Sequence, residues 1–165
     1  MIKSKVSKLS IVTELDVYQS EKDLSKKDAE LLEEARKILK NAYAPYSNFH
    51  VGAAILLENG KIVTGNNQEN AAYPSGLCAE RVAIFYAGAH YPNVGVNTIA
   101  ISVKSKSVVI KEPLSPCGGC RQAIAEYENK FGKDIRIIMS GEKGKIYIAK
   151  SIESLLPLMF SKKYL

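Results

Sequence analysis

The clearest pattern of apolar positions lies between Ser25 and Ala42, where apolar residues recur every three or four positions. They are Leu31, Leu32, Ala35, Ile38, Leu39 and Ala42. This spacing is typical of an amphipathic helix. Ser25 followed by Asp28 is typical of a helix N-cap with an acid in the first turn. The pattern therefore predicts a helix over residues 26–42, which the Pro-containing segment 43–47 ends.

Two apolar runs come next, His50–Leu57 and Lys61–Gly65, and Asn59-Gly60 lies between them. Asn-Gly between apolar runs is the strongest short-range signal for a β-hairpin. Beyond a loop at 66–76, the patterns predict helices and strands in alternation. These are helices at 78–89 and 117–131, strands at 97–103, 135–140 and 146–149, and a short helix from Ser151. The alternation indicates an α/β sandwich on one mixed sheet, which the hairpin makes partly antiparallel.

Ahead of these elements, apolar residues alternate with mostly polar ones, which is the period of a β-strand. The positions are Leu9, Ile11, Thr13, Leu15 and Val17. They predict an N-terminal strand.

The chain of 165 residues is 46% hydrophobic and 24% charged, which is typical of one globular domain with its own core. No apolar run approaches the roughly 20 residues of a membrane helix. The charged start Met1–Lys5 has no apolar stretch behind it, so it does not resemble a signal peptide. We expect a soluble, cytoplasmic protein with no membrane partner.

The net charge of +6 raises the question of a nucleic-acid partner. Surfaces that bind nucleic acid cluster their positive charge on one face or along one helix. Here the 19 lysines are scattered along the chain, arginines number only four, and eight of the 17 acids lie between Glu14 and Glu34. We therefore expect no nucleic-acid partner.

The three cysteines are an odd number, which argues against a disulfide framework. Cys117 and Cys120 are three apart, so on a helix they share one face and can bind one metal ion. Cys78 supplies a third sulfur, also at a predicted helix start. A closed structural zinc site needs a fourth ligand, and neither His50 nor His90 has suitable spacing. Three protein ligands and a water molecule form the open, catalytic type of site.

Glu80 lies two residues after Cys78, in the first turn of a predicted helix. First-turn side chains lean past the helix N-terminus, so both residues can reach one point. A carboxylate near metal-bound water can accept a proton and later deliver it. The alternative is that Glu80 only complements the helix dipole.

The sequences Cys78-Ala79-Glu80 and Pro116-Cys117-Gly118-Gly119-Cys120 match the zinc-dependent deaminase pattern. From about Tyr43 to Phe160 the chain closely resembles the small, homotetrameric cytidine deaminases. The matching blocks, in order, are Tyr46–Ala54, Asn67–Pro74, Cys78–Arg81, Ser115–Gln122 and Leu155–Phe160. The resemblance implies a three-layer α/β/α sandwich, with a catalytic domain at 25–165 after an N-terminal extension at 1–24.

The resemblance also implies a reaction: hydrolytic deamination of cytidine and 2′-deoxycytidine to uridine and 2′-deoxyuridine, with release of ammonia, in pyrimidine salvage. One zinc ion per chain, held by Cys78, Cys117 and Cys120, would activate a water molecule for attack on C4 of the pyrimidine. Glu80 would take the water proton, protonate N3 and pass a proton to the departing amine.

Substrate contacts follow from the same resemblance. Asn67 and Glu69 would bind the ribose 3′-hydroxyl, because an amide and a carboxylate offer it complementary partners. The alternative is that both cap local backbone. Phe49 would pack on the base, unless it is plain core, and the backbone of Ala79 would contact the polar edge of the base.

Three thiolates around Zn²⁺ total −1, which makes the metal a poorer Lewis acid. Helix N-termini at Cys78 and Cys117 would offset part of this charge. By resemblance, Arg81 would hydrogen-bond the ligand sulfurs and so tune the metal. Arg121 is a weaker candidate for a similar role, and an ordinary surface arginine is the alternative for Arg81.

The segment Leu155–Phe160 is strongly apolar for a chain end. A monomer would tuck it into its own core. The resemblance instead implies a homotetramer with shared active sites, in which Tyr73 and Phe160 approach a neighbour's site. Other hypotheses are a deaminase of another cytosine-containing small molecule such as a nucleoside antibiotic, a nucleic-acid deaminase, and a zinc-stabilised binding module without activity.

Overall fold

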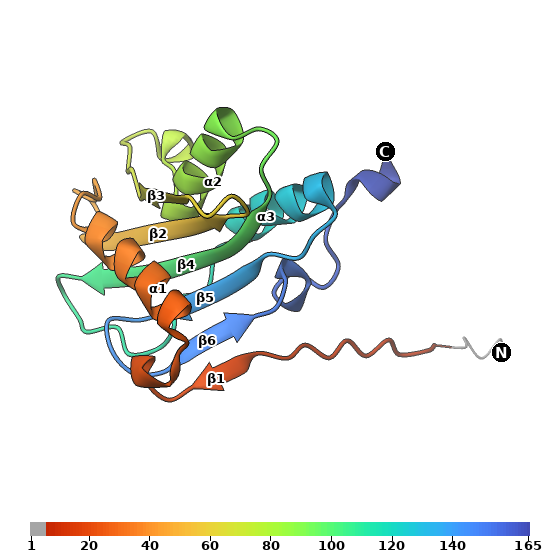
Figure 1. The fold of residues 1–165 in the computed structure, drawn as a ribbon, viewed down its shortest axis with the longest axis horizontal. Coiled ribbons are helices and arrows are strands. Elements are labelled where there is room, and N and C mark those ends of the chain that lie inside the picture. The colour runs from red at the N-terminus through yellow and green to blue at the C-terminus, as the bar shows by residue number, and fades with distance from the viewer. Residues whose placement is uncertain (1–5) are drawn as a thin grey trace.

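The computed structural model describes residues 6–165, and its centre is one mixed six-stranded sheet (Figure 1). The strand order is β1-β6-β5-β4-β2-β3. Only β4 and β5 pair in parallel, whereas the other neighbours are antiparallel. The strands are β1 Asp16–Tyr18, β2 Phe49–Leu57, β3 Ile62–Asn66, β4 Val96–Ser105, β5 Arg136–Ser140 and β6 Ile146–Ala149.

Helices cover both faces of the sheet, which confirms the expected three-layer α/β/α arrangement (Figure 1). The α-helices are α1 Lys26–Leu39 on one face, and α2 Ala79–His90 and α3 Gly118–Phe131 on the other. The described part of the chain also contains four short 3-10 helices: η1 Glu21–Asp23, η2 Tyr73–Ser75, η3 Ile152–Ser154 and η4 Lys162–Tyr164. No helix within residues 6–165 has the length and apolar character that a membrane crossing needs.

Helix α1 begins as predicted and ends three residues early. The Ser25 hydroxyl caps it by accepting the Asp28 backbone N–H at 3.2 Å. At the other end, the N–H groups of Lys40, Asn41 and Ala42 each bond a carbonyl three residues back. These tighter bonds satisfy the last carbonyls and turn the chain away from the helix.

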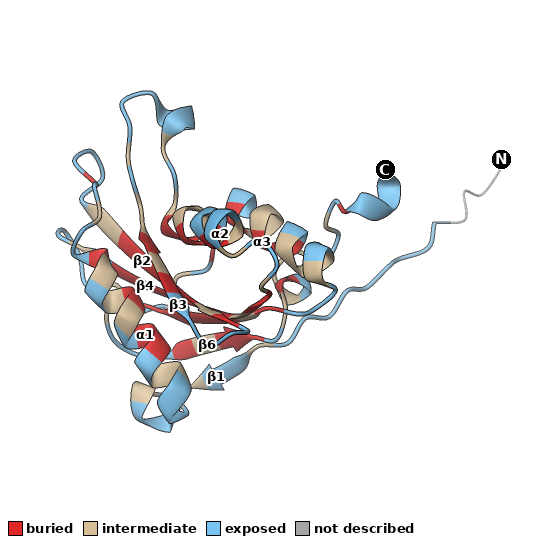
Figure 2. Ribbon diagram, turned by 45° about the horizontal axis from the view of Figure 1, so that its top comes forward, coloured by how far each residue is buried: buried red, intermediate tan, exposed pale blue. Residues whose placement is uncertain are grey.

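The apolar runs in the strands arise because helices cover both faces. In β4, Ile99 and Ile101 pack in the cluster beneath α2 and α3, whereas Ala100 between them packs in the cluster beneath α1. The buried residues accordingly concentrate on the sheet and on the helix surfaces facing it (Figure 2). A strand buried on both faces has a continuous apolar sequence instead of an alternating one.

Two glycines let helices lie directly on strand backbone. A Cβ at Gly52 of β2 would lie 2.0 Å from the Ala35 carbonyl oxygen of α1. A Cβ at Gly65 of β3 would lie 2.6 Å from the Ala83 nitrogen and 2.7 Å from the Ala79 oxygen. Gly65 thus sets how closely the first turns of α2 approach the sheet.

The predicted N-terminal strand was wrong over residues 9–15. Of this N-terminal segment, only Asp16–Tyr18 (β1) pairs with β6, and Asp16 lies opposite Ile148. Because β6 ends at Ala149, the residues before β1 find no strand partner there. They continue as an extended arm that leaves the sheet, and Leu9 is 81% exposed (Figure 1).

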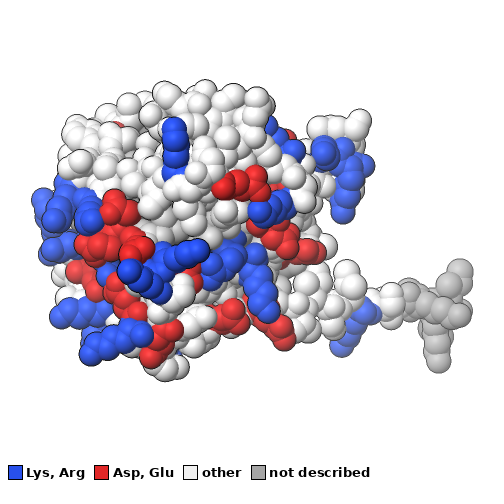
Figure 3. All heavy atoms as spheres, in the orientation of Figure 1, with Lys and Arg blue, Asp and Glu red and all other residues white. Residues whose placement is uncertain are grey.

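Charge is mixed on the face that α1 covers. Figure 3 shows lysines and arginines interspersed with acids over this face. Ion pairs such as Arg36–Glu21 at 2.5 Å and Lys37–Glu34 at 2.7 Å combine the two signs along α1.

We predict that Leu32→Ala destabilises the protein, because Leu32 is 0% exposed between α1 and the sheet. Truncation of such a side chain leaves a cavity and lowers the free energy of unfolding by about 2–5 kcal/mol. Urea denaturation at fixed protein concentration measures it. The matched control is Leu9→Ala on the exposed arm, which should change that free energy by less than about 0.5 kcal/mol. Equal losses in both variants would contradict this packing.

Candidate metal and active site

The three cysteines meet where two helices begin. Cys78 is the N-cap of α2, Cys117 is the N-cap of α3, and Cys120 lies in the first turn of α3. Their sulfurs all lie within 4.8 Å of one another. The Cys78–Cys117 Sγ distance is 3.8 Å and the Cys117–Cys120 distance is 3.5 Å.

This geometry fits a zinc ion. All three cysteines are free, and tetrahedral ligation with Zn–S bonds of about 2.3 Å separates sulfurs by about 3.8 Å. Both helix N-termini favour negative charge at the sulfurs. Within residues 6–165, this is the one cluster of three or more His, Cys, Asp or Glu side chains that could hold a metal ion, and it contains three residues. Three protein ligands leave a fourth position open, as in catalytic zinc sites.

The sulfurs are electrostatically prepared for a cation. The neighbouring Cys120 thiol, and after it the Arg81 guanidinium, lower the pKa of Cys78 from 9.0 to about 5, although burial opposes this. Arg81 donates from Nη2 to the Cys78 sulfur at 3.8 Å. Interaction with Cys78 and burial together raise the pKa of Cys120.

Glu80 lies in the same place and is almost completely buried, with 3% of its surface exposed. Burial raises the pKa of its carboxyl group. Its Oε2 and the Nε of Arg81 are buried without a hydrogen-bond partner in the described chain. Because unpartnered buried polar atoms are costly, these two groups indicate that a bound ligand or water supplies the missing partners.

Two adjoining hollows open at the cysteines. One has a volume of about 620 Å³ and is lined by Phe49, Glu80, Cys117 and parts of the loop 105–115. The other has a volume of about 480 Å³, and Tyr73 and Arg81 are among its lining residues. The residues that line both are Ser47, Asn67, Glu69 and Cys78.

Asn67 and Glu69 bond to the protein backbone within this site. The Asn67 side chain accepts the Val51 N–H at 2.8 Å and donates to the Phe49 carbonyl at 2.9 Å. Glu69 accepts the N–H of Tyr46 at 2.9 Å and the hydroxyl of Ser47, which lowers the pKa of its carboxyl. Both side chains therefore bond to local backbone, as the alternative interpretation expects, and both also line the hollows.

The remaining predicted residues divide into two groups. Ala79 is fully buried at the start of α2, beside Cys78 and Glu80. Tyr73 lines the smaller hollow and is 78% exposed. Phe160 is 58% exposed and lines neither hollow, because its segment is held against α3 by the Gln122 side chain, which donates to the Phe160 carbonyl at 2.9 Å.

Two features were not predicted. The loop 105–115 lines the larger hollow but contains no motif that would have identified it. Arg121 has backbone and hydroxyl partners in place of the expected sulfurs: it donates to Pro116 O at 2.8 Å, Ser115 Oγ at 2.9 Å and Leu155 O at 2.7 Å.

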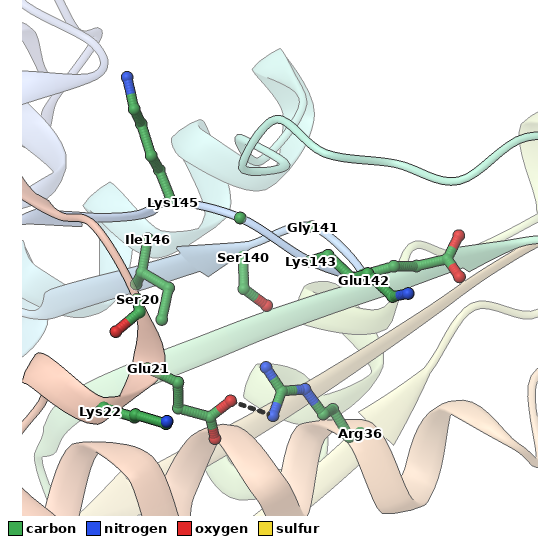
Figure 4. Close-up of a pocket in the computed structure, with 11 residues that line it drawn as sticks. Ser20, Glu21, Lys22, Arg36, Ser140, Gly141, Glu142, Lys143, Lys145 and Ile146 are labelled. Atoms are coloured by element: carbon green, nitrogen blue, oxygen red, sulfur yellow. Dashed lines mark hydrogen bonds and ion pairs between the residues drawn. The ribbon is translucent and has the colours of Figure 1, made fainter.

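Another cavity lies between α1, residues 20–22 and the β5–β6 turn (Figure 4). It has a volume of about 650 Å³, and the Glu21–Arg36 ion pair is its main polar contact. Figure 4 shows the Lys145 side chain pointing away from that pair. Its lining includes no cysteine or histidine, so the metal chemistry belongs to the cysteine site.

Comparison with known proteins agrees with this geometry. Residues 25–131 match the family described as the cytidine and deoxycytidylate deaminase zinc-binding region. A cytidine deaminase from Sporosarcina psychrophila is 42% identical over 135 residues, which are 81% of this chain and 90% of that protein. A blasticidin-S deaminase from Bacillus cereus is 28% identical over 142 residues, 85% of this chain and 96% of that protein. The crystal structure of a cytidine deaminase from Burkholderia pseudomallei superposes with a TM-score of 0.69 at 34% identity, covering 83% of this chain and all of that one.

The fold and the three-cysteine centre define a zinc-binding hydrolase that deaminates its substrate. The chain belongs to the cytidine and deoxycytidylate deaminase family.

We predict one zinc ion per chain, and its loss in Cys117→Ala, because two sulfurs cannot replace the three-sulfur site. Zinc affinity should fall more than about tenfold. Metal analysis after dialysis against a weak chelator measures it. Gly119→Ala is the matched control, since a Cβ there meets no atom within 4 Å, and it should keep its zinc. Full zinc in Cys117→Ala would show that the site is elsewhere.

Proposed function

We propose that the protein hydrolyses cytidine and 2′-deoxycytidine to uridine and 2′-deoxyuridine with release of ammonia, as a step of pyrimidine salvage. The observation that carries this proposal is the buried Glu80 carboxyl beside three convergent cysteine sulfurs, with its Oε2 lacking a hydrogen-bond partner within residues 6–165. Membership of the deaminase family and similarity to proteins named cytidine deaminase support it.

Zinc bound by Cys78, Cys117 and Cys120 would supply Lewis-acid activation of a water molecule. The protein's own contribution is proton movement by Glu80. Its carboxylate accepts the proton of the attacking water and delivers it to N3 of the base. It then takes the proton of the new hydroxyl group at C4 and passes it to the departing amine, so that the C4–N bond breaks, ammonia leaves and a C4 carbonyl forms. A carboxyl with a raised pKa suits this work because it must both hold and release the proton.

The side chains around the hollows would select a nucleoside. Phe49 would pack on the base, the Ala79 backbone would contact its polar edge, and Asn67 with Glu69 would hold the ribose 3′-hydroxyl. The bonds from Asn67 to Phe49 and Val51 fix that amide before substrate arrives, and this favours binding. A volume of about 620 Å³ lies in the usual range for small-molecule sites.

We also propose a homotetramer in which neighbouring subunits complete each active site. Exposed aromatic side chains support this, because soluble monomers rarely expose large apolar patches. Tyr73, Phe85, Tyr86 and Phe160 are all exposed. Tyr73 and Phe160 would approach a neighbour's site, and the exposure of Phe160 away from its own hollows is consistent with that role.

A second candidate function is deamination of another cytosine-containing small molecule, such as a nucleoside antibiotic. The similarity to a protein named blasticidin-S deaminase favours it. The lysines scattered along the chain, with only four arginines, favour a small molecule over a nucleic acid in either case. Three free thiols suit a reducing compartment, and we propose the cytoplasm.

Ammonia release measured over a panel of nucleosides and cytosine-containing antibiotics, with zinc quantified, tests the function. Cytidine and 2′-deoxycytidine should be the best substrates. Turnover of an antibiotic alone would favour the second candidate, and no turnover by zinc-loaded protein would reject both.

We predict that Glu80→Gln lowers kcat by at least about 10²–10⁴-fold with zinc retained, because glutamine keeps the shape but cannot carry the proton. Steady-state kinetics and metal analysis on the same sample measure both quantities. Glu126→Gln on the exposed side of α3 is the matched control and should behave as wild type. Near-normal turnover in Glu80→Gln would reject the proton-transfer role.

We predict that Phe160→Ala lowers kcat/KM for cytidine while zinc content stays full. Loss of an aromatic contact removes about 0.5–1.5 kcal/mol beyond burial, or roughly a two- to thirteenfold effect. Leu165→Ala, at the exposed chain end, is the control.

Mixing Phe160→Ala with Glu80→Gln tests the shared site directly. Hybrid oligomers should regain some activity, since each subunit supplies a part that the other lacks. Full activity of a monomer in light scattering would contradict shared sites, as would mixtures whose activity, after proven subunit exchange, does not exceed the sum of the two variants measured separately.

A further inference from the structure

Arg121 joins two segments that are distant in sequence. It lies in the first turn of α3, where its backbone N–H donates to the Cys117 carbonyl at 2.9 Å. Its side chain turns back toward the loop before Cys117, donating from Nε to Pro116 O at 2.8 Å and from Nη2 to Ser115 Oγ at 2.9 Å. The remaining nitrogen, Nη1, donates to Leu155 O at 2.7 Å.

The guanidinium group therefore bonds to the loop before Cys117 and to the C-terminal segment at the same time. All three side-chain distances lie in the range of strong, charge-assisted hydrogen bonds. Among residues 6–165, no carboxylate forms an ion pair with Arg121, so neutral oxygens of the two segments are its partners. A lysine has one nitrogen and cannot reproduce this planar fork.

Helix α3 holds the C-terminal segment 155–160 at two points, and the bond from Arg121 to Leu155 is the first. Leu155 is the C-cap of η3. Ile152 of η3 is fully buried, and its backbone N–H donates to the Glu128 carboxylate at 2.9 Å. Five residues after Leu155, the Phe160 carbonyl accepts the Gln122 side chain at 2.9 Å. Consecutive residues of α3 thus hold both ends of the segment 155–160.

We infer that Arg121 is a positioning residue that couples the loop carrying Cys117 to the C-terminal segment carrying Phe160. Ordering of this loop by metal then also orders the segment 155–160. By linkage the effect is reciprocal, so breaking the contact between Arg121 and Leu155 weakens metal binding. The inference rests on the proposed function only where it assigns Phe160 to a neighbour's site.

The test is hydrogen exchange of residues 155–160, in zinc-loaded and zinc-depleted full-length protein at one protein concentration. In wild type, zinc removal should accelerate this exchange by about five- to tenfold, the size of an ordinary coupling between sites. In Arg121→Lys, which keeps the charge and loses the fork, the acceleration should fall to less than about twofold. Arg36→Lys, across the sheet on α1, is the matched control and should respond as wild type.

A second measurement separates coupling from a general loss of structure. Zinc release to a chelator should be about tenfold faster in Arg121→Lys. Gln122→Ala, which frees only the Phe160 end, should raise exchange there in both zinc states and leave zinc release unchanged. If Arg121→Lys does not fold, Ser115→Ala replaces it, since it removes one loop bond and should lower the zinc response of the segment partially.

Two results would overturn the inference: no zinc effect on residues 155–160 in wild type, or the same effect in Arg121→Lys. Deamination is measured separately on the zinc-loaded wild type. Absent turnover with an intact, Arg121-dependent exchange response would reject the proposed function and leave the coupling standing. Normal turnover without that response would support the proposed function and reject the coupling.

Discussion

The approach of two helix N-termini, those of α2 at Cys78 and α3 at Cys117, is the constraint on which the site depends. It brings three sulfurs within 4.8 Å of one another. Sulfurs at that spacing repel one another once they are ionised, and the partial positive charge of both helix ends offsets this. The sheet holds the ends in place: Gly65 allows the first turn of α2 to lie against β3 without a Cβ between them.

Burial of Glu80 follows from the same constraint. Its position two residues into α2 places a carboxyl in the core beside the thiols, where one oxygen has no partner in residues 6–165. A small soluble domain tolerates such a cost at few places. Burial raises the pKa of the same carboxyl group, which suits it to the proton transfer that we propose for it. In this proposal, local destabilisation and function have one origin.

Around this centre, hydrogen bonds from individual side chains connect segments that no single helix or strand joins. Asn67 ties the end of β3 to β2, and Glu69 holds the turn at Tyr46 and Ser47. Arg121 connects the Cys117 loop to the C-terminal segment. Asn67 and Glu69 also line both hollows, so residues that shape the site support the fold as well.

The sequence by itself determined the elements and the chemistry, because both depend on residues close together in the chain. Ser25 marked the start of α1, Asn59-Gly60 the hairpin, and the spacing of Cys78, Glu80, Cys117 and Cys120 the zinc-deaminase centre. Only the tertiary structure decided which distant groups meet. Strand β1 is short because β6 ends at Ala149, and Arg121 reaches Leu155 and not the sulfurs because η3 lies against α3. Phe160 lines neither of the hollows at its own cysteines for a similar reason, since Gln122 holds its backbone on α3. Such contacts join residues more than 30 positions apart, and no local pattern encodes them.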